Sequence, residues 1–381
     1  MQNKFDDIRP YYSSEIPPAM QRIAGSEYFE TLSQYIFPNE NVEDVRERVR
    51  NIRTTDEFQQ KIMYFVNRQI IARSVSELTY GGLNRLEREK SYLFISNHRD
   101  IMLDSSLFQY VLHTNGFRTT EITFGSNLMH PQLVVDIGKA NKMFKVIRSS
   151  NIRSFLENSM HLSEYIRYTI REKGESVWIA QRNGRTKDGN DVTDQGIIKM
   201  FCMSKATDLI LSMGELNIVP VAVSYQIESC DFLKTRELYL SRDGRKYVKQ
   251  PGEDLQSILT GIFQLKGAVN IRVCKPITAG DLDIDYKFPN EFYKKVAALI
   301  DRRIYENYKL YNNNFIAYDI RSGSTKYRDF YTPEEKEMFV EHCHTMIEQI
   351  DGDRETLRYI FLGIYATPIE NAEKNPIFFN N

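Results

Sequence analysis

Short apolar runs alternate with longer stretches of helical periodicity through the middle of the chain. Each short run is bounded by glycine or polar turn residues, a pattern typical of strands buried on both faces. We predict strands at 78–80, 92–95, 121–125, 144–148, 177–180, 218–223 and 269–274. Apolar residues at helical spacing predict helices between them, at 104–115, from 131, at 152–173 and at 196–213. This alternation predicts an α/β fold with a mostly parallel, doubly wound sheet and helices on both faces.

The two ends of the chain are predominantly helical. Residues 1–75 form a charged N-terminal helical region with a break at 37–39, and residues 291–381 form a C-terminal helical region. In the latter, the capping box Thr332-Pro333-Glu334-Glu335 predicts a helix that runs to about 350, and another is predicted from 353 to 365. Residues 76–290 remain as the α/β core. The N-terminal region is interpreted as a packing or dimerising appendage, or as a lid or membrane-facing layer over a site.

A histidine lies between one predicted strand and the helix that follows it. The strand at 92–95 stops at Ser96-Asn97-His98-Arg99-Asp100, and the helix begins at Asp104. In open α/β sheets, ligands bind beyond the carboxyl ends of the strands. An imidazole there can take a proton from an alcohol, and a carboxylate, either Asp104 or Asp100, can orient it. The structural alternative is that Asn97 and His98 satisfy backbone groups and Asp104 caps the helix.

Basic residues follow two further predicted strands. Arg148 ends the strand at 144–148, and the strand at 177–180 leads into a loop with Arg182, Gly184, Arg185 and Lys187. Guanidinium groups hold phosphates through paired hydrogen bonds, and glycine lets a backbone approach one closely. A base beside a phosphate clamp predicts an enzyme that deprotonates a hydroxyl on a phosphorylated or anionic acceptor.

Composition restricts the classes of ligand and partner that we expect. Fifty Lys and Arg balance 51 Asp and Glu, so charge gives no indication of nucleic-acid binding. Four scattered cysteines indicate neither a disulfide framework nor a paired-cysteine zinc site, and no metal is predicted. Neither a secretory signal nor an apolar run of the roughly 18 residues that span a bilayer is recognisable. We expect a cytoplasmic protein that meets lipid peripherally, at the inner face of the membrane. The basic residues at 139–153 are interpreted as a phosphate clamp, a surface for anionic lipid or a carrier protein, or a solvated helix face.

Four short blocks in order resemble the motifs of one enzyme family. They are Asn97-His98 with Asp104; Phe144, Ile147 and Arg148; the loop 181–187; and the apolar strand 218–221 with Pro220. Over roughly residues 76–276 the chain resembles the glycerol-3-phosphate and lysophosphatidate acyltransferase superfamily, as a divergent member. No serine-hydrolase motif G-x-S-x-G occurs, and Gly138-Lys139 lacks the context of a nucleotide-binding loop.

The resemblance implies a reaction and roles for the residues. An acyl chain arrives as a thioester on coenzyme A or acyl carrier protein and passes to a hydroxyl of a glycerol phosphate or lysophospholipid. His98 is the implied base, with Asp104 or Asp100 orienting it. Residues implied to bind substrate are Asn97, Arg148 and Arg185, with Gly184 and, as lesser candidates, Arg182 and Lys187. No tightly bound cofactor is implied.

Two departures from the family pattern leave alternatives open. Five residues rather than four separate His98 from Asp104, so a bulge or an extra half-turn is needed to bring them together. Gln181 and Asn183 stand where the family carries a glutamate. These changes favour an altered acceptor, such as an amino-acid-based lipid, or a non-catalytic relative that binds lipid or acyl carrier protein.

Overall fold

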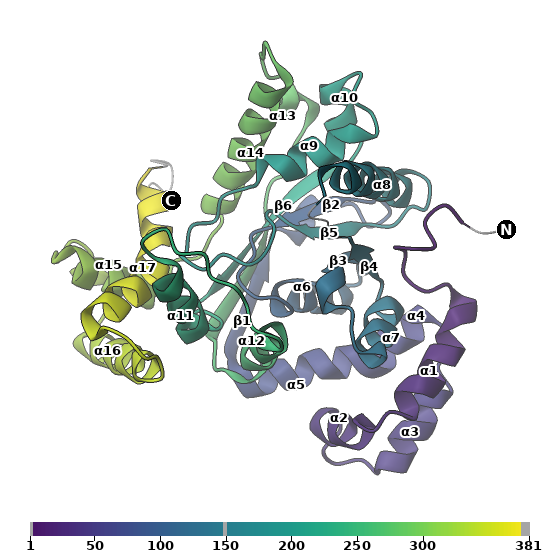
Figure 1. Ribbon diagram of the computed structural model, residues 1–381, viewed down its shortest axis with the longest axis horizontal. Coiled ribbons are helices and arrows are strands. Elements are labelled where there is room, and N and C mark those ends of the chain that lie inside the picture. Colours follow the sequence, from purple (N-terminus) through teal and green to yellow (C-terminus); the bar gives the residue numbers. More distant parts are fainter. Residues whose placement is uncertain (1–2, 148–150, 375–381) are drawn as a thin grey trace.

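A seven-stranded sheet forms the centre of the computed structural model, which describes residues 3–147 and 151–374 (Figure 1). The strand order is β1-β7-β6-β2-β5-β3-β4. The strands are β1 Val75–Gly81, β2 Leu93–Ser96, β3 Glu121–Gly125, β4 Met143–Val146, β5 Val177–Ala180, β6 Ile218–Tyr225 and β7 Gly267–Val273. All seven were predicted from their apolar runs, and β3 and β5 have the predicted bounds.

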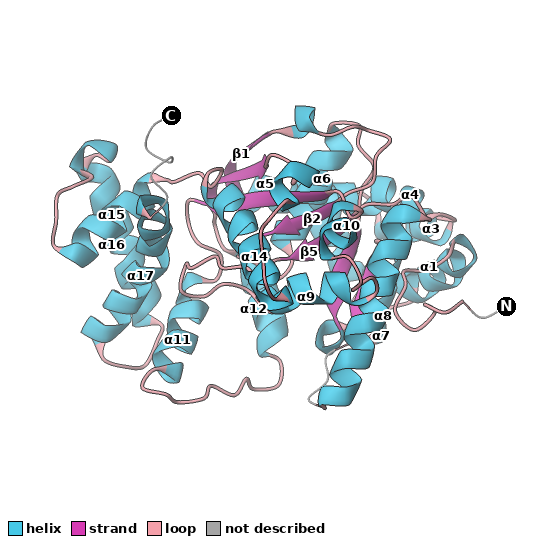
Figure 2. Cartoon of the chain, turned by 90° about the horizontal axis from the view of Figure 1, so that it is seen from above, coloured by secondary structure: helices cyan, strands magenta, loops and turns pink. Residues whose placement is uncertain are grey.

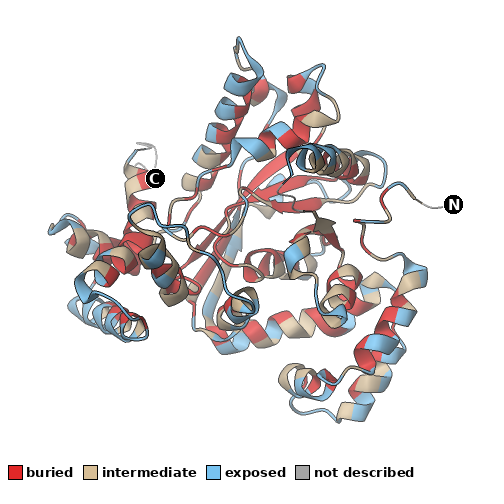
Figure 3. Ribbon diagram, viewed as in Figure 1, coloured by how far each residue is buried: buried red, intermediate tan, exposed pale blue. Residues whose placement is uncertain are grey.

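The sheet is mostly parallel, as predicted. Strands β6, β2, β5, β3 and β4 run in one direction, and β1 and β7 run in the other because β7 pairs antiparallel with β6. Helices α8 (Ile152–Arg171), α9 (Gln195–Met203) and α14 (Pro289–Tyr305) pack on one face, around Leu93 and Ile95 of β2. Helices α5 (Tyr64–Ser74) and α6 (Leu103–Thr114) pack on the other, around Phe94. Both faces are therefore covered, which explains the continuous apolar runs and the buried strands of Figure 3.

The N-terminal helices form a layer with its own apolar cluster. They are α1 Ile16–Ala24, α2 Phe29–Ile36, α3 Val42–Arg50 and α4 Thr55–Phe58, and a π-helical turn, Gln59–Met63, leads into α5. The break predicted at 37–39 separates α2 from α3. Arg22 of α1 is paired with the buried Asp136 of α7 (Gln132–Ala140) at 2.6 Å, so this layer packs onto the core.

The C-terminal helices surround a further apolar cluster. They are α15 Asn312–Ser322, α16 Pro333–Glu348 and α17 Arg354–Glu373. The predicted capping box is present: the Thr332 side chain accepts from the Glu335 backbone N–H, and the Glu335 side chain accepts from that of Thr332. Helix α17 continues beyond the predicted end at 365. Within the described ranges, no helix is both long and apolar enough to cross a bilayer.

Several helical predictions were incomplete. The helix predicted at 196–213 is two helices, α9 and α10 (Leu209–Gly214), because the Asp208 side chain accepts from the Leu211 N–H and starts a new one. Helices α11 (Asp231–Ser241), α12 (Glu253–Phe263) and α13 (Ala279–Leu282) were not predicted, and α15 lies in the predicted C-terminal helical region but was not given bounds. In α11 the buried positions include Asp231, Lys234 and Thr235. Because these buried residues are polar, the sequence of α11 has no apolar periodicity that would mark its inward face.

Candidate functional site

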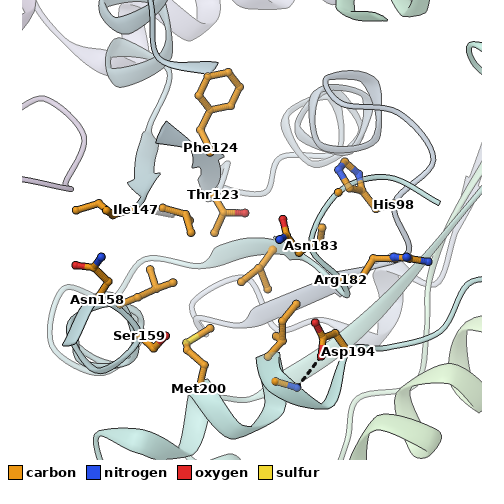
Figure 4. A pocket seen from close by; sticks show the side chains of 18 of the residues that line it. His98, Thr123, Phe124, Ile147, Asn158, Ser159, Arg182, Asn183, Asp194 and Met200 are labelled. Carbon is orange, nitrogen blue, oxygen red and sulfur yellow. Dashed lines mark hydrogen bonds between the residues drawn. The ribbon is translucent and has the colours of Figure 1, made fainter. Parts of the chain in front are cut away.

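A cavity of about 330 Å³ lies beyond the carboxyl ends of β2, β3, β4 and β5 (Figure 4). We call it the apolar cavity, because most of the side chains that line it are apolar: Ile101, Phe124, Leu128, Val146, Ile147, Phe155, Leu162, Trp178, Ile179, Ile197 and Met200. Its polar lining includes His98, Arg182 and Asn183 at one side and Asn158 and Ser159 of α8 at the other. A mainly apolar pocket with a few polar groups is the usual form of a small-molecule site.

His98 and Asp104 are in contact, as the sequence predicted. The His98 Nδ1 lies 3.0 Å from the Asp104 Oδ2, and the Asp104 side chain is fully buried. Since a carboxylate accepts, Nδ1 carries the proton and Nε2 is the ring nitrogen left for a ligand. His98 borders the apolar cavity, so the imidazole combines a buried orienting carboxylate with access to a ligand.

The turn between β2 and α6 wraps around the Asp104 carboxylate. Its Oδ2 also accepts from the backbone N–H groups of Arg99 (2.7 Å) and Asp100 (2.9 Å). Its Oδ1 accepts from the Tyr225 hydroxyl at 2.8 Å. Burial, followed by the charges of Asp104 and Asp100, raises the pKa of Tyr225 well above its ordinary value, so this hydroxyl stays a donor. The segment between His98 and Asp104 is one residue longer than in the family pattern. The backbone N–H groups of Arg99 and Asp100 bond to the Asp104 carboxylate, and this turn brings the carboxylate to His98.

Asp100 does not have the orienting role that was considered for it. Its Oδ1 accepts from the backbone N–H groups of Met102 and Leu103, both at 2.8 Å, and its Oδ2 accepts from the Ser229 hydroxyl. Asp100 therefore caps the start of α6 and joins it to the segment before α11. The carboxylate that contacts His98 is Asp104.

Asn97 was expected to bind substrate, and the structure contradicts this. It is fully buried, and its side chain donates to the Val223 carbonyl and to Asp191 Oδ2, each at 2.9 Å, and accepts from the Val223 N–H at 2.8 Å. These bonds join the end of β2 to β6. Asn97 is a structural residue that holds the strand end in place beside His98.

A buried group of four charged residues supports the His98 turn. Arg99, which is 1% exposed, is paired with Asp191 at 2.8 Å and with Glu228 at 3.4 Å. The Lys234 ammonium bonds to the Glu228 carboxylate and donates to the Arg99 carbonyl at 2.7 Å. Burial alone would lower the pKa of Arg99, but its attraction to Asp191, Tyr308 and Glu228 is stronger, so the pKa is raised. Two cations and two carboxylates balance, so this group of four carries no net charge.

The predicted phosphate-binding residues separate into three groups. Arg182 and Gly184 border the apolar cavity, and Arg182 forms no ion pair with another described residue. Arg185 and Lys187 are not among the residues that line it: the buried Arg185 donates to the Ser257 hydroxyl of α12 at 3.0 Å, and Lys187 is paired with Glu237 of α11. These contacts attach both side chains to helices α11 and α12, although the buried Nη1 of Arg185 has no hydrogen-bond partner among the described residues. Their assignment to the acceptor phosphate stays a prediction. Arg148 lies outside the described residues.

The two amides at the position of the family's glutamate have different surroundings. Gln181 is fully buried at the end of β5, where its backbone N–H donates to the Ser96 carbonyl at 2.8 Å. Asn183 is exposed and lines the apolar cavity. Of the two, only Asn183 is positioned to contact a ligand in the apolar cavity.

Sequence reasoning missed the residues that support His98 from other elements. Tyr225 ends β6, Asp191 follows the loop after β5, and Trp178 lies on β5 with its ring centroid 6.3 Å from that of His98. Each is far from His98 along the chain. The sequence contained only a weak signal for this pair: Arg99 is a charge shortly after β2, and Asp191 is an opposite charge in the segment between β5 and α9.

Asp301 of α14 forms hydrogen bonds to the segment between β5 and α9, and its pKa leads to a prediction about how stability depends on pH. Its Oδ1 accepts from the Thr193 N–H at 2.8 Å and from the Thr193 hydroxyl at 2.5 Å. Burial raises the pKa of Asp301 to about 6 from an ordinary value of 3.8, against the opposing effect of the Thr193 bonds. The folded state therefore holds this proton more tightly than the unfolded chain. The stabilisation is complete below about pH 4 and is lost as the pH rises through 6.

We therefore expect Asp301→Asn to stabilise the protein at pH 8 and to have little effect at pH 4. An amide oxygen still accepts both Thr193 bonds, and the gain at pH 8 is about 1–3 kcal/mol. Urea unfolding of both proteins at the two pH values measures it. The exposed Asp283→Asn is the control, and an equal effect at both pH values would contradict the assignment.

Comparisons with known proteins add little to this geometry. No protein-family model matches the sequence, and no curated protein matches it. Among solved structures, the chain is similar to the 1-acyl-sn-glycerophosphate (LPA) acyltransferase PlsC from Thermotoga maritima. The identity is 14%, the similarity covers 77% of this chain and 97% of that chain, and the TM-score is 0.38.

Proposed function

We propose that this chain transfers an acyl group from a thioester to a hydroxyl of an anionic, lipid-type acceptor. The donor is acyl coenzyme A or acyl carrier protein, and the acceptor is of the glycerol phosphate or lysophospholipid type. One observation carries the proposal: His98, held by the buried Asp104 at 3.0 Å, borders an apolar cavity of about 330 Å³. The site thus offers a proton acceptor next to space for a hydrocarbon chain.

His98 acts as the general base in the proposed reaction. Its Nε2 takes the proton of the acceptor hydroxyl as that oxygen attacks the thioester carbonyl carbon. The C–S bond then breaks, and the departing thiolate takes the proton from the imidazolium. Asp104 holds the ring and stabilises its positive charge between the two transfers. No covalent enzyme intermediate is needed, since the acceptor itself is the nucleophile.

The lining of the cavity favours an acyl chain as its occupant. The apolar side chains come mainly from β3, β4, β5, α8 and α9, and transfer of a chain from water to such a lining is favourable for each methylene. Positioning both reactants beside one base also removes much of the entropic barrier of a bimolecular step.

Arg182 is the residue that we propose for the acceptor's anionic group. It borders the cavity on the same side as His98 in Figure 4, and it makes no ion pair with the other described residues. A guanidinium without a carboxylate partner is a suitable donor for phosphate. Gly184 next to it leaves open space at the position where a Cβ would stand.

A second function is favoured by Asn183. This exposed amide lines the cavity at a position where the family pattern led us to expect a glutamate, and it gives no charge-assisted hydrogen bond to an acceptor hydroxyl. A non-catalytic protein that binds a lipid or an acyl carrier in the apolar cavity is therefore the alternative.

Incubation of the purified protein with labelled acyl thioesters distinguishes the two functions. Donors are acyl coenzyme A and acyl carrier protein, and acceptors are glycerol 3-phosphate, lysophosphatidate and an N-acylated amino acid with a free hydroxyl. We expect label in an ester product with one acceptor and free thiol in equal amount. Binding of the donor without turnover by any acceptor would support the alternative.

Ser159 leads to a prediction about chain length. It lines the cavity on the side opposite His98 (Figure 4). We expect Ser159→Leu to fill that end and to shift the preference towards shorter acyl donors, by about tenfold in the ratio of kcat/KM for one or two methylenes. A series of acyl coenzyme A chain lengths measures the shift. Ser154→Leu, on the same helix but outside the lining, is the control, and an unchanged chain-length profile would contradict this orientation of the chain.

A further inference from the structure

Helix α12 presents an apolar stripe to solvent. Leu255, Leu259 and Phe263 are 57%, 45% and 59% exposed, and their spacing of four residues places them on one face. All three line an open hollow on the surface. Three large apolar side chains in a row are more than the scattered exposure that soluble surfaces usually carry.

The inner side of α12 packs against two segments that border the apolar cavity. The Ser257 hydroxyl accepts from Arg185, which follows the cavity residue Gly184. Near the start of the helix, Asp254 accepts from Asn127 at 3.0 Å, and Asn127 precedes the cavity residue Leu128. The exposed stripe thus lies on the outside of an element that forms part of the surroundings of the site.

Positive charge lies directly before the stripe. The segment that joins α11 to α12 carries Arg242, Arg245, Lys246 and Lys249 against the single acid Asp243. Arg245 and Lys246 are exposed, as is the apolar Val248 at 66%. Exposed bases beside an exposed apolar helix face are the pattern of an element that lies on an anionic lipid surface.

A second apolar stripe begins α8. Ile152, Phe155, Leu156 and Met160 are exposed, Ile152 at 80%, and share one helical face. Phe155 also lines the apolar cavity, so this stripe reaches the site itself. In Figure 2 the first turns of α8 and the segment that joins α11 to α12 lie at the same edge of the molecule.

The basic window considered from the sequence is less suited to such contact. Lys142 is paired with Glu175 at 3.3 Å, and Lys139 lies over the Tyr11 ring at 5.4 Å. Both side chains, and that of Lys145, are half-buried. In segment 242–249, Lys249 is paired with Asp254 at 2.5 Å and the half-buried Arg242 with Asp243 at 3.6 Å. The exposed Arg245 and Lys246 are therefore the better candidates.

We propose that segment 242–249, the α12 stripe and the first turns of α8 form one surface that docks on an anionic bilayer. The inference rests on the proposed function in one respect, which is that lipid reaches the apolar cavity from that bilayer. Two apolar stripes on separate helices match a flat apolar layer better than the small surface of an acidic carrier protein, which is the alternative occupant.

Co-sedimentation of the full chain with vesicles tests this surface. The vesicles are phosphatidylcholine alone or an equal mixture with phosphatidylglycerol. We expect the parent to bind only the anionic vesicles, and less in high salt. Arg245→Gln with Lys246→Gln lowers the binding constant by about 25-fold, at about fivefold for each base. Leu255→Gln with Leu259→Gln lowers it by about tenfold or more.

Matched controls are taken from exposed positions elsewhere. Lys294→Gln with Lys336→Gln controls for charge, and Met338→Gln with Val340→Gln on α16 controls for apolar exposure. Both are expected to bind as the parent does. The proposal is overturned if the parent does not bind anionic vesicles, if the docking variants bind like the parent, or if they lose affinity for acyl carrier protein instead of vesicles.

A second measurement separates this inference from the proposed function. With a short-chain, water-soluble thioester and acceptor, the docking variants are expected to turn over as fast as the parent. Loss of vesicle binding with unchanged soluble turnover supports the docking surface. If the parent has no acyl-transfer activity but its vesicle binding depends on the docking residues, the proposed function fails and the docking surface remains.

Discussion

His98→Ala is expected to lower kcat for acyl transfer by at least about a hundredfold, since a positioned general base contributes about 10²–10⁴-fold. The fold should survive, because the His98 side chain is 12% exposed at the edge of a cavity and Asp104 keeps three further donors. Steady-state turnover with a labelled thioester measures the loss, and urea unfolding measures the stability.

His161→Ala is the matched control for this substitution. His161 Nε2 also lies 3.0 Å from a carboxylate, that of Asp7, but on the surface and away from the cavity. We expect the control to retain parental turnover. Activity of His98→Ala within tenfold of the parent would show that the imidazole does not carry the reaction.

Arg99→Met is expected to destabilise the protein by about 3–5 kcal/mol, the usual cost of removing one partner from a buried ion pair. Asp191 and Glu228 would stay buried with Lys234 as the remaining cation of the group. The hydrogen bond from Arg99 Nη2 to the Gly189 carbonyl, 3.1 Å long, would also be lost. Equilibrium unfolding in urea at pH 7 measures the change in the free energy of unfolding.

Two further variants define the cause of that loss. Arg153→Met removes an exposed pair with Glu157 and is expected to cost less than about 1 kcal/mol. Arg99→Lys keeps the charge but not the planar fork, so an intermediate loss is expected. If Arg99→Met cost no more than the surface variant, the four buried charges would not be what stabilises the turn that carries His98.

The strands and the helices on the sheet were predictable because their burial is simple. A strand covered on both faces is an uninterrupted apolar run, and β3 and β5 accordingly had the predicted bounds. Helices α11 and α12 were not predictable. The first buries Asp231, Lys234 and Thr235, and the second exposes Leu255 and Leu259, so neither has the usual apolar inward face.

In the candidate site, too, some contacts could be predicted from the sequence and others could not. His98 and Asp104 lie within six positions, so local spacing was sufficient to suggest their contact. Arg185 and Lys187 were assigned to a phosphate by their position after a strand, but their partners, Ser257 and Glu237, come from helices far along the chain. The direction of a loop side chain depends on such partners, and spacing contains no information about them.

By itself the sequence determined the strands of the core and several of the helices that cover the sheet, because periodicity records which side of each element is buried. It also suggested that an imidazole and a carboxylate meet at a strand end, because only a short turn joins them. Only the tertiary structure decided that Asp104 rather than Asp100 is the partner, that Asn97 holds strands together, and that the site opens onto an apolar cavity. Those outcomes depend on contacts between residues distant in the chain, such as Tyr225 with Asp104 and Asp191 with Arg99, which form only when the whole sheet is assembled.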